Sequence, residues 1–402
     1  MKRFFLLLFI VIFTFSLLPV NADLKEDERP VFSADDYLID VSDAMPVDAL
    51  AECAAGAILV EAESGEVLFE SNADERLPIA SVTKVMTMLL TVEAIEDGRL
   101  KLDDVVTVSE NAASMGGSQA FMEPGEKMSV HDMLKAVAVS SCNDGAVALA
   151  EHLAGSEGEF VNMMNARAGA LGMTSTEFVN CTGLDDNEMH YSSARDVALM
   201  SKALISHPLI FDYTTIWMDS IRDGSFGLAN TNKLIRFYDG ANGLKTGSTS
   251  KARFCLSASA KRNGVQLIAV VLGAPTSAER LAAARGLLDY GFANFSVYHP
   301  KTENISPVKI WGGKEEKVAV EFDKTPRLMK KGEESKIEEI VELKKDVKAP
   351  VKKGDVLGEI VYKMGDSVLF KSEIKASSDV EKAGVWDTFV DILTRVLYGK
   401  TK

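Results

Sequence analysis

The hydrophobic pattern of the chain predicts alternating β-rich and helical segments from about residue 51 onward. Residues 57–62 and 67–70 are β-rich runs on either side of a turn that contains Gly65, which predicts a hairpin. Residues 85–95 are apolar over the length of a buried helix that closes at Asp97-Gly98. A short strand is expected at 105–108, and further helices over 129–139, from 144 to 155, over 160–171 and over 194–205.

A second hairpin follows these helices. Residues 254–260 and 265–272 flank Asn263-Gly264, which is a strong hairpin signal. The hairpin places Lys245-Thr246-Gly247 on or just before an antiparallel strand. A long helix is expected from 278 to about 293.

The pattern changes from Ser296 onward. Val318, Val320 and Phe322 alternate with charged or small residues, and short strand candidates at 356–362 and 368–370 lie between turn residues, which predicts a small β-rich domain. The end of the chain predicts an amphipathic helix that is too short to span a bilayer. Its apolar face consists of Trp386, Phe389, Val390, Leu393, Val396 and Leu397.

The first 22 residues have the three parts of a secretory signal peptide. Met1-Lys2-Arg3 is basic, residues 4–18 are apolar, and Val20-Asn21-Ala22 supplies a small-residue cleavage site. The alternative is an uncleaved N-terminal anchor. We expect the mature protein to work outside the cytoplasm.

Charge and cysteine content exclude some classes of function. The chain has 44 basic and 59 acidic residues and a net charge of −15, which argues against nucleic acid as a partner. Four scattered cysteines form no disulfide framework or metal-ligand cluster, and each is interpreted as a small buried hydrophobe. They are Cys53, Cys142, Cys181 and Cys255, of which Cys142 could be reactive if it is exposed.

The loop at residues 180–188 is acidic, but it lacks the fixed spacing of a calcium loop. We interpret it as a solvated loop, and no metal is expected. His190 beside it is interpreted as a packed or capping histidine without a chemical role.

The first candidate for chemistry is the pair Ser81 and Lys84. A serine hydroxyl is a weak nucleophile that needs a neighbouring proton acceptor, and a lysine three residues later on a helix lies on the same face. At a helix N-terminus the unpaired N–H groups also favour developing negative charge. The alternative is that Ser81 only caps the helix.

Two further motifs follow in chain order. They are Ser141-Cys142-Asn143, on the connection between two predicted helices, and Lys245-Thr246-Gly247. A serine and lysine motif, a Ser-x-Asn type triplet and a Lys-Thr-Gly triplet form the signature of serine β-lactamases and penicillin-binding proteins. For the middle motif alone, a simple polar turn and helix cap is the alternative.

With these motifs the chain resembles the low-molecular-mass penicillin-binding proteins, specifically the secreted serine-type D-alanyl-D-alanine carboxypeptidases of bacteria. The resemblance implies an α+β fold: a serine β-lactamase/transpeptidase-like domain, with an antiparallel sheet flanked by helices and a helical subdomain. A small β-rich domain and a C-terminal amphipathic helix follow. The expected division is 1–22 signal peptide, 23–50 linker or arm, 51–295 carboxypeptidase domain, 296–379 β-rich domain and 380–402 membrane-anchor helix.

The resemblance also implies a role for each motif residue. Ser81 would be the acylated nucleophile, Lys84 its proton acceptor, Ser141 a proton relay, and Asn143 a holder of the substrate or the lysine. Lys245, Thr246 and Arg280 would meet the terminal carboxylate of the substrate, for which arginine offers a two-point donor. Gly247 completes the third motif, and the backbone N–H groups of Ser81 and Ser248 would form the oxyanion hole. The alternative for Arg280 is a surface helix residue.

The implied reaction removes the terminal D-alanine from peptidoglycan stem pentapeptides without a metal or cofactor, and β-lactams should inhibit it. A secreted β-lactamase is an alternative, although the β-rich domain and the lack of an E-x-x-x-N motif between the second and third motifs argue against it. A non-catalytic cell-wall-binding scaffold is an alternative of another class. Two positions depart from the family pattern. Cys142 is an unusual residue at the variable centre of the second motif, and Thr182 stands where some relatives carry a histidine.

The terminal helix is expected to attach the protein peripherally to the outer face of the cytoplasmic membrane. Trp386 and Tyr398 suit a membrane interface, whereas few basic residues are present to attract anionic lipid. The alternative is a helix packed against the β-rich domain.

Overall fold

The computed structural model describes residues 53–184 and 189–386, with positions 389, 390, 393 and 397 of the last helix. The predictions for residues 1–50 and for the acidic positions 185–188 lie outside these residues, as do Val396 and Tyr398.

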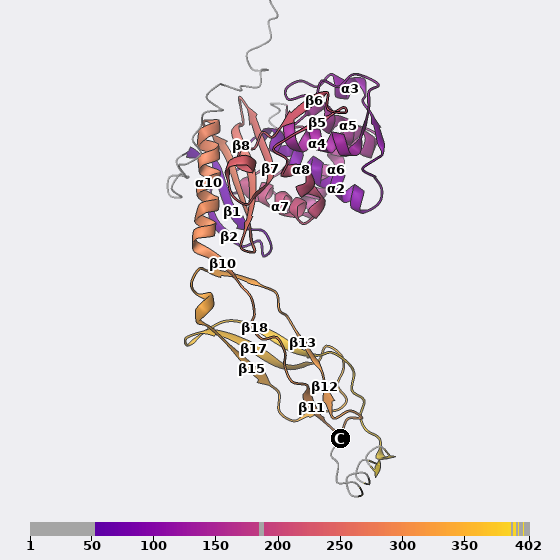
Figure 1. Ribbon diagram of the computed structural model, residues 1–402, viewed down its shortest axis with the longest axis vertical. Coiled ribbons are helices and arrows are strands. Elements are labelled where there is room, and N and C mark those ends of the chain that lie inside the picture. The colour runs from indigo at the N-terminus through magenta and orange to yellow at the C-terminus, as the bar shows by residue number, and fades with distance from the viewer. Residues whose placement is uncertain (1–52, 185–188, 387–388, 391–392, 394–396, 398–402) are drawn as a thin grey trace, which may run out of the picture.

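A five-stranded antiparallel sheet forms the centre of the N-terminal part (Figure 1). Its strand order is β2-β1-β9-β8-β7. Successive residues of a strand face opposite sides of the sheet. Ile58 and Val60 therefore join a core with the helical subdomain, while Ala57 and Leu59 join a core with helix α10. The strands are β1 (Gly56–Glu61), β2 (Val67–Ser71), β7 (Ala241–Thr249), β8 (Arg253–Arg262) and β9 (Val265–Ala274), and α10 spans Ser277–Asn294.

Helix α2 (Lys84–Glu96) is the central element of the helical subdomain, and it is buried on nearly all sides. A helix that is apolar all round is typical of a protein interior, and α2 packs against α4, α5, α6 and α7. Side chains cap several of these helices; Ser129, for example, accepts a hydrogen bond from the Asp132 N–H at the start of α4. The helices are α3 (Glu110–Ala113), α4 (Val130–Ser140), α5 (Asn143–Ala154), α6 (Glu157–Ala170), α7 (Ala194–Ile205), α8 (Phe211–Thr214) and α9 (Leu234–Phe237).

Short elements connect these helices. Two hairpins pair β3 (Val105–Thr107) with β4 (Lys127–Ser129) and β5 (Met218–Ile221) with β6 (Phe226–Ala229). Two 3-10 turns, η4 (Ala80–Thr83) and η5 (Pro208–Ile210), precede α2 and α8.

A separate β-rich part follows α10 and extends away from its end (Figure 1). Strand β10 (Phe295–Tyr298) pairs with β14 (Arg327–Lys330), and two further sheets have the orders β12-β11-β16 and β13-β18-β17-β15. These sheets enclose two small hydrophobic cores of their own. The remaining elements are β11 (Val308–Trp311), β12 (Lys317–Val318), β13 (Val320–Phe322), η6 (Glu334–Lys336), β15 (Ile337–Leu343), β16 (Val347–Lys348), β17 (Val356–Met364) and β18 (Ser367–Ala376).

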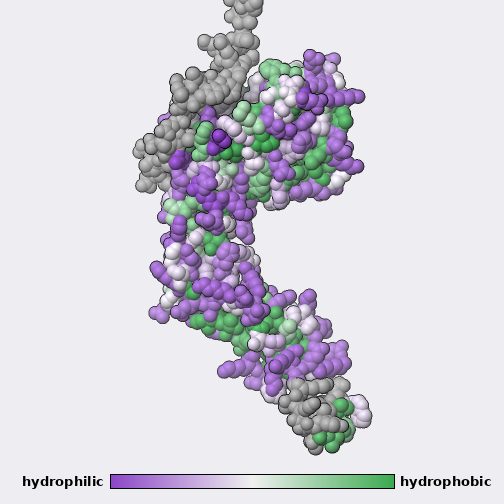
Figure 2. Space-filling model, in the orientation of Figure 1, coloured by the Kyte–Doolittle hydropathy of each residue, from purple (hydrophilic) through white to green (hydrophobic). Residues whose placement is uncertain are grey.

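The described residues of the terminal helix lie at the end of the β-rich part that is far from the five-stranded sheet (Figure 1). Their large apolar side chains are between 46% and 91% exposed, and Figure 2 shows hydrophobic surface at this end of the molecule. They are Val385, Trp386, Phe389, Val390, Leu393 and Leu397. Within the described residues no helix combines the length and hydrophobicity that a membrane crossing requires.

The predicted α+β fold is confirmed, with local corrections. Ser81 does not lie in the first turn of α2 but in the 3-10 turn η4 before it. Asn143 does not lie on the connection between helices, because it is the first residue of α5. Ser141 does lie on that connection, where it ends α4 with a left-handed φ of 63°.

Candidate active site

The hydroxyl of Ser81 and the amine of Lys84 are directly hydrogen-bonded. The tight turn η4 places the two side chains together, and Lys84 Nζ lies 2.9 Å from Ser81 Oγ. Lys84 Nζ also donates to Asn143 Oδ1 at 2.5 Å and to the Thr182 carbonyl at 2.8 Å. These three acceptors match the three hydrogens of an ammonium group.

Lys84 has an unusually low pKa. Its side chain is completely buried, and burial disfavours the charged form, which lowers the pKa to about 7. A large fraction of Lys84 is therefore a neutral amine at neutral pH, and only the neutral form can accept a proton.

Asn143 connects the second motif to the loop at residues 116–122. Its Nδ2 donates to the Gly116 carbonyl and its backbone N–H to the Ser118 carbonyl, both at 2.7 Å. The neighbouring Asp144 carboxylate accepts from the backbone N–H groups of Ala120 and Met122. The loop therefore fixes the amide of Asn143 against Lys84, while the buried Ser141 lies two residues earlier.

The third motif lies in the interior of strand β7. Lys245 is buried, and its Nζ donates to the Thr246 carbonyl at 2.9 Å. Burial and the positive charges of Lys84 and Arg280 hold the pKa of Lys245 well below its ordinary value. Three basic side chains thus influence one another here, and an anionic ligand would favour their charged forms.

Arg280 is buried in the first turn of α10, so it is not a surface residue. Its guanidinium donates to Ser277 Oγ at 3.0 Å and lies 5.7 Å from the centre of the Phe254 ring. Its charge affects the pKa of Lys245 on β7. Arg280 therefore lies beside the strand pair that carries the third motif, because Phe254 on β8 is paired with Ser248 on β7.

Gly247 allows β7 to approach the turn that carries Ser81. A Cβ atom at this position would lie 2.8 Å from the Ile79 carbonyl oxygen and 2.9 Å from the backbone nitrogens of Ser81 and Val82. A side chain here would force the strand away from these N–H groups. The exposed Ser248 follows directly, so its backbone adjoins the same region.

Several residues outside the three motifs hold the site together, and the sequence did not predict the contacts of Gly183 and Thr182. Gly183 has a φ of +71°, and a Cβ atom there would lie 1.9 Å from the Ala80 carbonyl oxygen. His190 Nε2 lies 2.7 Å from Thr83 Oγ1 within η4, which confirms its interpretation as a packed histidine. The sequence singled out Thr182 only as a departure from some relatives, and it gave no signal that the backbone carbonyl of this residue receives the Lys84 hydrogen bond.

Cys142, Cys181 and Cys255 are buried, as predicted, and Cys53 is partly buried; all four are free thiols. Burial raises the pKa of the Cys142 thiol to about 12, so the structure does not support the suggestion that Cys142 is reactive. The described part of the chain contains no group of metal-ligating side chains.

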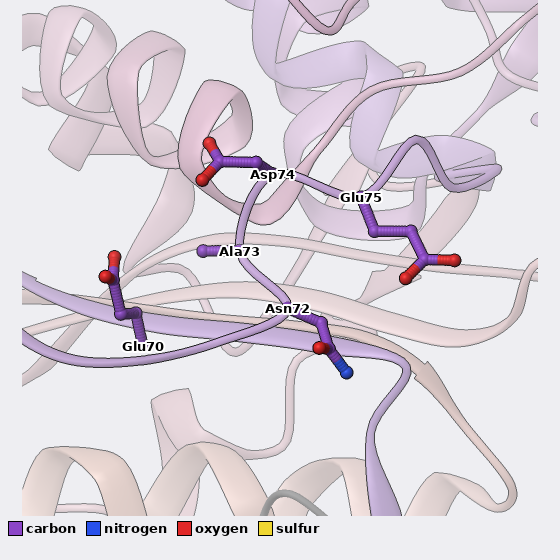
Figure 3. A pocket seen from close by; sticks show the side chains of 5 residues that line it. All are labelled: Glu70, Asn72, Ala73, Asp74 and Glu75. Carbon is purple, nitrogen blue, oxygen red and sulfur yellow. The ribbon is translucent and has the colours of Figure 1, made fainter.

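A surface cavity of about 440 Å³ is lined by residues 70 and 72–75, none of which belongs to the three motifs (Figure 3). Arg195 pairs there with Glu70 at 2.6 Å and with Asp74 at 2.7 Å. We interpret these two ion pairs as a structural contact between α7 and the end of β2.

An antiparallel sheet between helices, with a serine and lysine pair beside a Lys-Thr-Gly strand, defines the class of serine β-lactamases and penicillin-binding proteins. Within this class, the D-alanyl-D-alanine carboxypeptidase family matches residues 43–276, and the penicillin-binding protein 5 C-terminal domain matches residues 292–382. The chain belongs to the D-alanyl-D-alanine carboxypeptidase family, which confirms the predicted serine-type carboxypeptidase activity. The comparisons favour this activity over the two alternatives, a secreted β-lactamase and a non-catalytic scaffold.

Individual relatives are similar over most of the chain. The D-alanyl-D-alanine carboxypeptidase DacF of Bacillus subtilis is 43% identical over 88% of this chain and 91% of its own. The crystal structure of penicillin binding protein 5 from Haemophilus influenzae is 31% identical, with a TM-score of 0.71, over 82% of this chain and 98% of that chain. Ampicillin-bound penicillin-binding protein D2 from Listeria monocytogenes is 35% identical, with a TM-score of 0.53, over 60% of this chain and 97% of that chain.

Proposed function

We propose that the enzyme removes the terminal D-alanine from peptidoglycan stem pentapeptides through an acyl-enzyme on Ser81. The observation that carries this proposal is the 2.9 Å contact between Lys84 Nζ and Ser81 Oγ, with a Lys84 pKa of about 7. A neutral amine at this distance can take the serine proton as the oxygen attacks.

The reaction has two steps. Ser81 Oγ attacks the carbonyl between the last two D-alanines, its proton passes to Lys84, and the C–N bond breaks as the departing amine of D-alanine receives a proton. Ser141 relays protons between Lys84 and the leaving group, and Asn143 keeps the lysine oriented. Water then attacks the ester, and Ser81 regains its hydrogen.

The substrate is held at its charged end and at its reacting carbonyl. The terminal carboxylate is bound by Lys245, Thr246 and Arg280. The burial of the two basic side chains, Lys245 and Arg280, and the effect of the Arg280 charge on the pKa of Lys245 support this assignment. The N–H groups of Ser81 and Ser248 bind the oxyanion, and Gly247 permits their approach. A β-lactam carries a comparable carboxylate and a reactive carbonyl, so it acylates Ser81 as well.

Release of D-alanine from a synthetic pentapeptide tests this proposal. Wild-type enzyme releases one D-alanine per peptide, whereas S81A releases none and keeps the melting temperature of the wild type within a few degrees. Equal release by S81A and wild type contradicts the assignment of the nucleophile.

We further propose that the terminal helix attaches the enzyme to the outer face of the cytoplasmic membrane after export by residues 1–22. Exposed apolar side chains such as Trp386 and Phe389 support this attachment. Deletion of residues 383–402 should leave carboxypeptidase activity intact and abolish co-sedimentation with phospholipid vesicles. Full-length mature protein that stays in the supernatant contradicts the proposal.

A further inference from the structure

The hydroxyl of Thr246 has a partner that none of the three motifs contains. Thr246 Oγ1 donates a hydrogen bond to Thr231 Oγ1 at 2.6 Å. Thr246 is buried and Thr231 is half-buried, so water competes little for this bond.

The backbone on both sides of Thr231 is held by two buried asparagines. Asn230 Nδ2 donates to the carbonyls of Thr214 and Ile216, and its Oδ1 accepts from the Asn232 N–H. Asn232 Nδ2 donates to the Gly243 carbonyl on β7 at 2.9 Å. The position of the Thr231 side chain is therefore imposed by its neighbours.

Thr231 also touches the helix that leads into the second motif. Its N–H donates to the Val139 carbonyl in the last turn of α4 at 3.1 Å, and Ser140 Oγ exchanges hydrogen bonds with the backbone of Ala229. Thr231 thus connects the end of α4 to the Lys-Thr-Gly strand. Because it is β-branched, its χ1 angle is stiff and its hydroxyl points in a defined direction.

We propose that Thr231 is a positioning residue that prepares the Thr246 hydroxyl for the substrate carboxylate. In the free enzyme Thr231 accepts the Thr246 hydrogen. When the carboxylate binds, Thr246 turns its hydrogen to the carboxylate, and Thr231 turns its own hydrogen to Thr246 Oγ1. Each hydroxyl keeps its own proton, because a hydroxyl can both donate and accept.

This exchange favours carboxylate binding for a physical reason. A hydrogen bond to an ionised acceptor is stronger than one between neutral groups, and donation by Thr231 polarises the Thr246 hydroxyl further. Thr246 Oγ1 also stays in place in both states, so no rotamer has to be ordered when the substrate arrives. Thr231 itself does not touch the substrate.

The role of Thr231 rests on the proposed role of Thr246 in binding the carboxylate. A matched pair of substrates distinguishes a failure of the first role from a failure of the second. The substrates are an acyl-D-alanyl thioester with a thioglycolate leaving group and the same thioester with thioglycolamide, which lacks the carboxylate. The kcat/KM of wild type, T231V, T231S and the control T215V is measured on both. Thr215 is exposed, and its hydroxyl donates to the Phe211 carbonyl at 2.6 Å.

For T231V we expect kcat/KM on the thioglycolate to fall roughly three- to tenfold, mainly through KM, with the thioglycolamide reaction unchanged within about twofold. T231S should recover most of the loss, and T215V should match wild type. Equal losses on both substrates, or no loss on the thioglycolate, overturn the role of Thr231. A wild-type enzyme that does not prefer the thioglycolate overturns the carboxylate site itself.

Discussion

Replacing Asn143 by aspartate should raise the pKa of Lys84 and move the pH profile of acylation. The amide oxygen of Asn143 lies 2.5 Å from Lys84 Nζ, and aspartate has nearly the same shape. An opposite charge this close favours the ammonium form and raises a lysine pKa by roughly one to three units. The pKa of Lys84 should therefore rise from about 7 to a value of roughly 8 to 10.

The size of the effect follows from the fraction of neutral amine. With a pKa of about 7, half of Lys84 is neutral at pH 7. Raising the pKa by one to three units lowers that fraction roughly 5- to 500-fold. Acylation at pH 7 should fall by this factor and recover toward pH 9 or 10, because more basic solution restores the neutral amine.

The assay is the second-order rate of acylation by a fluorescent penicillin between pH 5 and pH 10. The control N162D adds the same charge at an exposed position of α6 and should keep the wild-type midpoint near pH 7. An ionised aspartate cannot donate to the Gly116 carbonyl as Asn143 does. The acylation rate of N143D should therefore also fall by a second factor, which is the same at every pH. A lower rate with an unmoved midpoint refutes Lys84 as the proton acceptor.

Three further predictions concern the same site. G247A should lower acylation by at least roughly 100-fold while the protein stays folded, because its Cβ would lie 2.9 Å from the Ser81 nitrogen. Acylation within threefold of wild type refutes this, and the control is G169A, at an exposed position of α6 where a Cβ atom meets nothing within 4 Å. R280Q should raise KM for the pentapeptide roughly tenfold with a smaller change in kcat, and an unchanged KM removes Arg280 from the carboxylate site. The K84M variant should be more stable than wild type at pH 7. The pKa of Lys84 in the folded protein is about 7, below the ordinary value of 10.5, so the unfolded chain binds more protons than the folded chain between these pH values. The stability of wild type relative to K84M, measured by thermal unfolding, should therefore rise from pH 7 toward pH 10. A stability difference that stays constant over this range contradicts the lowered pKa.

Local signals predicted most of the fold. The Asn263-Gly264 turn and its flanking apolar runs predicted the hairpin of β8 and β9, where both turn residues have positive φ. Ser129 predicted the start of α4. These features depend on residues close in sequence, so a pattern can reveal them.

The parts of the site that could not be predicted depend on contacts between distant segments. Thr182 receives the Lys84 hydrogen bond across 98 positions of the chain, and it does so through a backbone carbonyl that every residue type has. Gly183 is required because η4 passes over it, and Thr231 matters because β7 lies beside it. Periodicity carries no information about such neighbours.

Peptide mapping of the penicillin-treated enzyme shows which residue carries the acyl group. The full mature chain is treated with benzylpenicillin, digested and sequenced by tandem mass spectrometry. We expect one penicilloyl group per chain, located on Ser81 and absent from S81A. A penicilloyl group on another residue, or equal labelling of S81A, would contradict it.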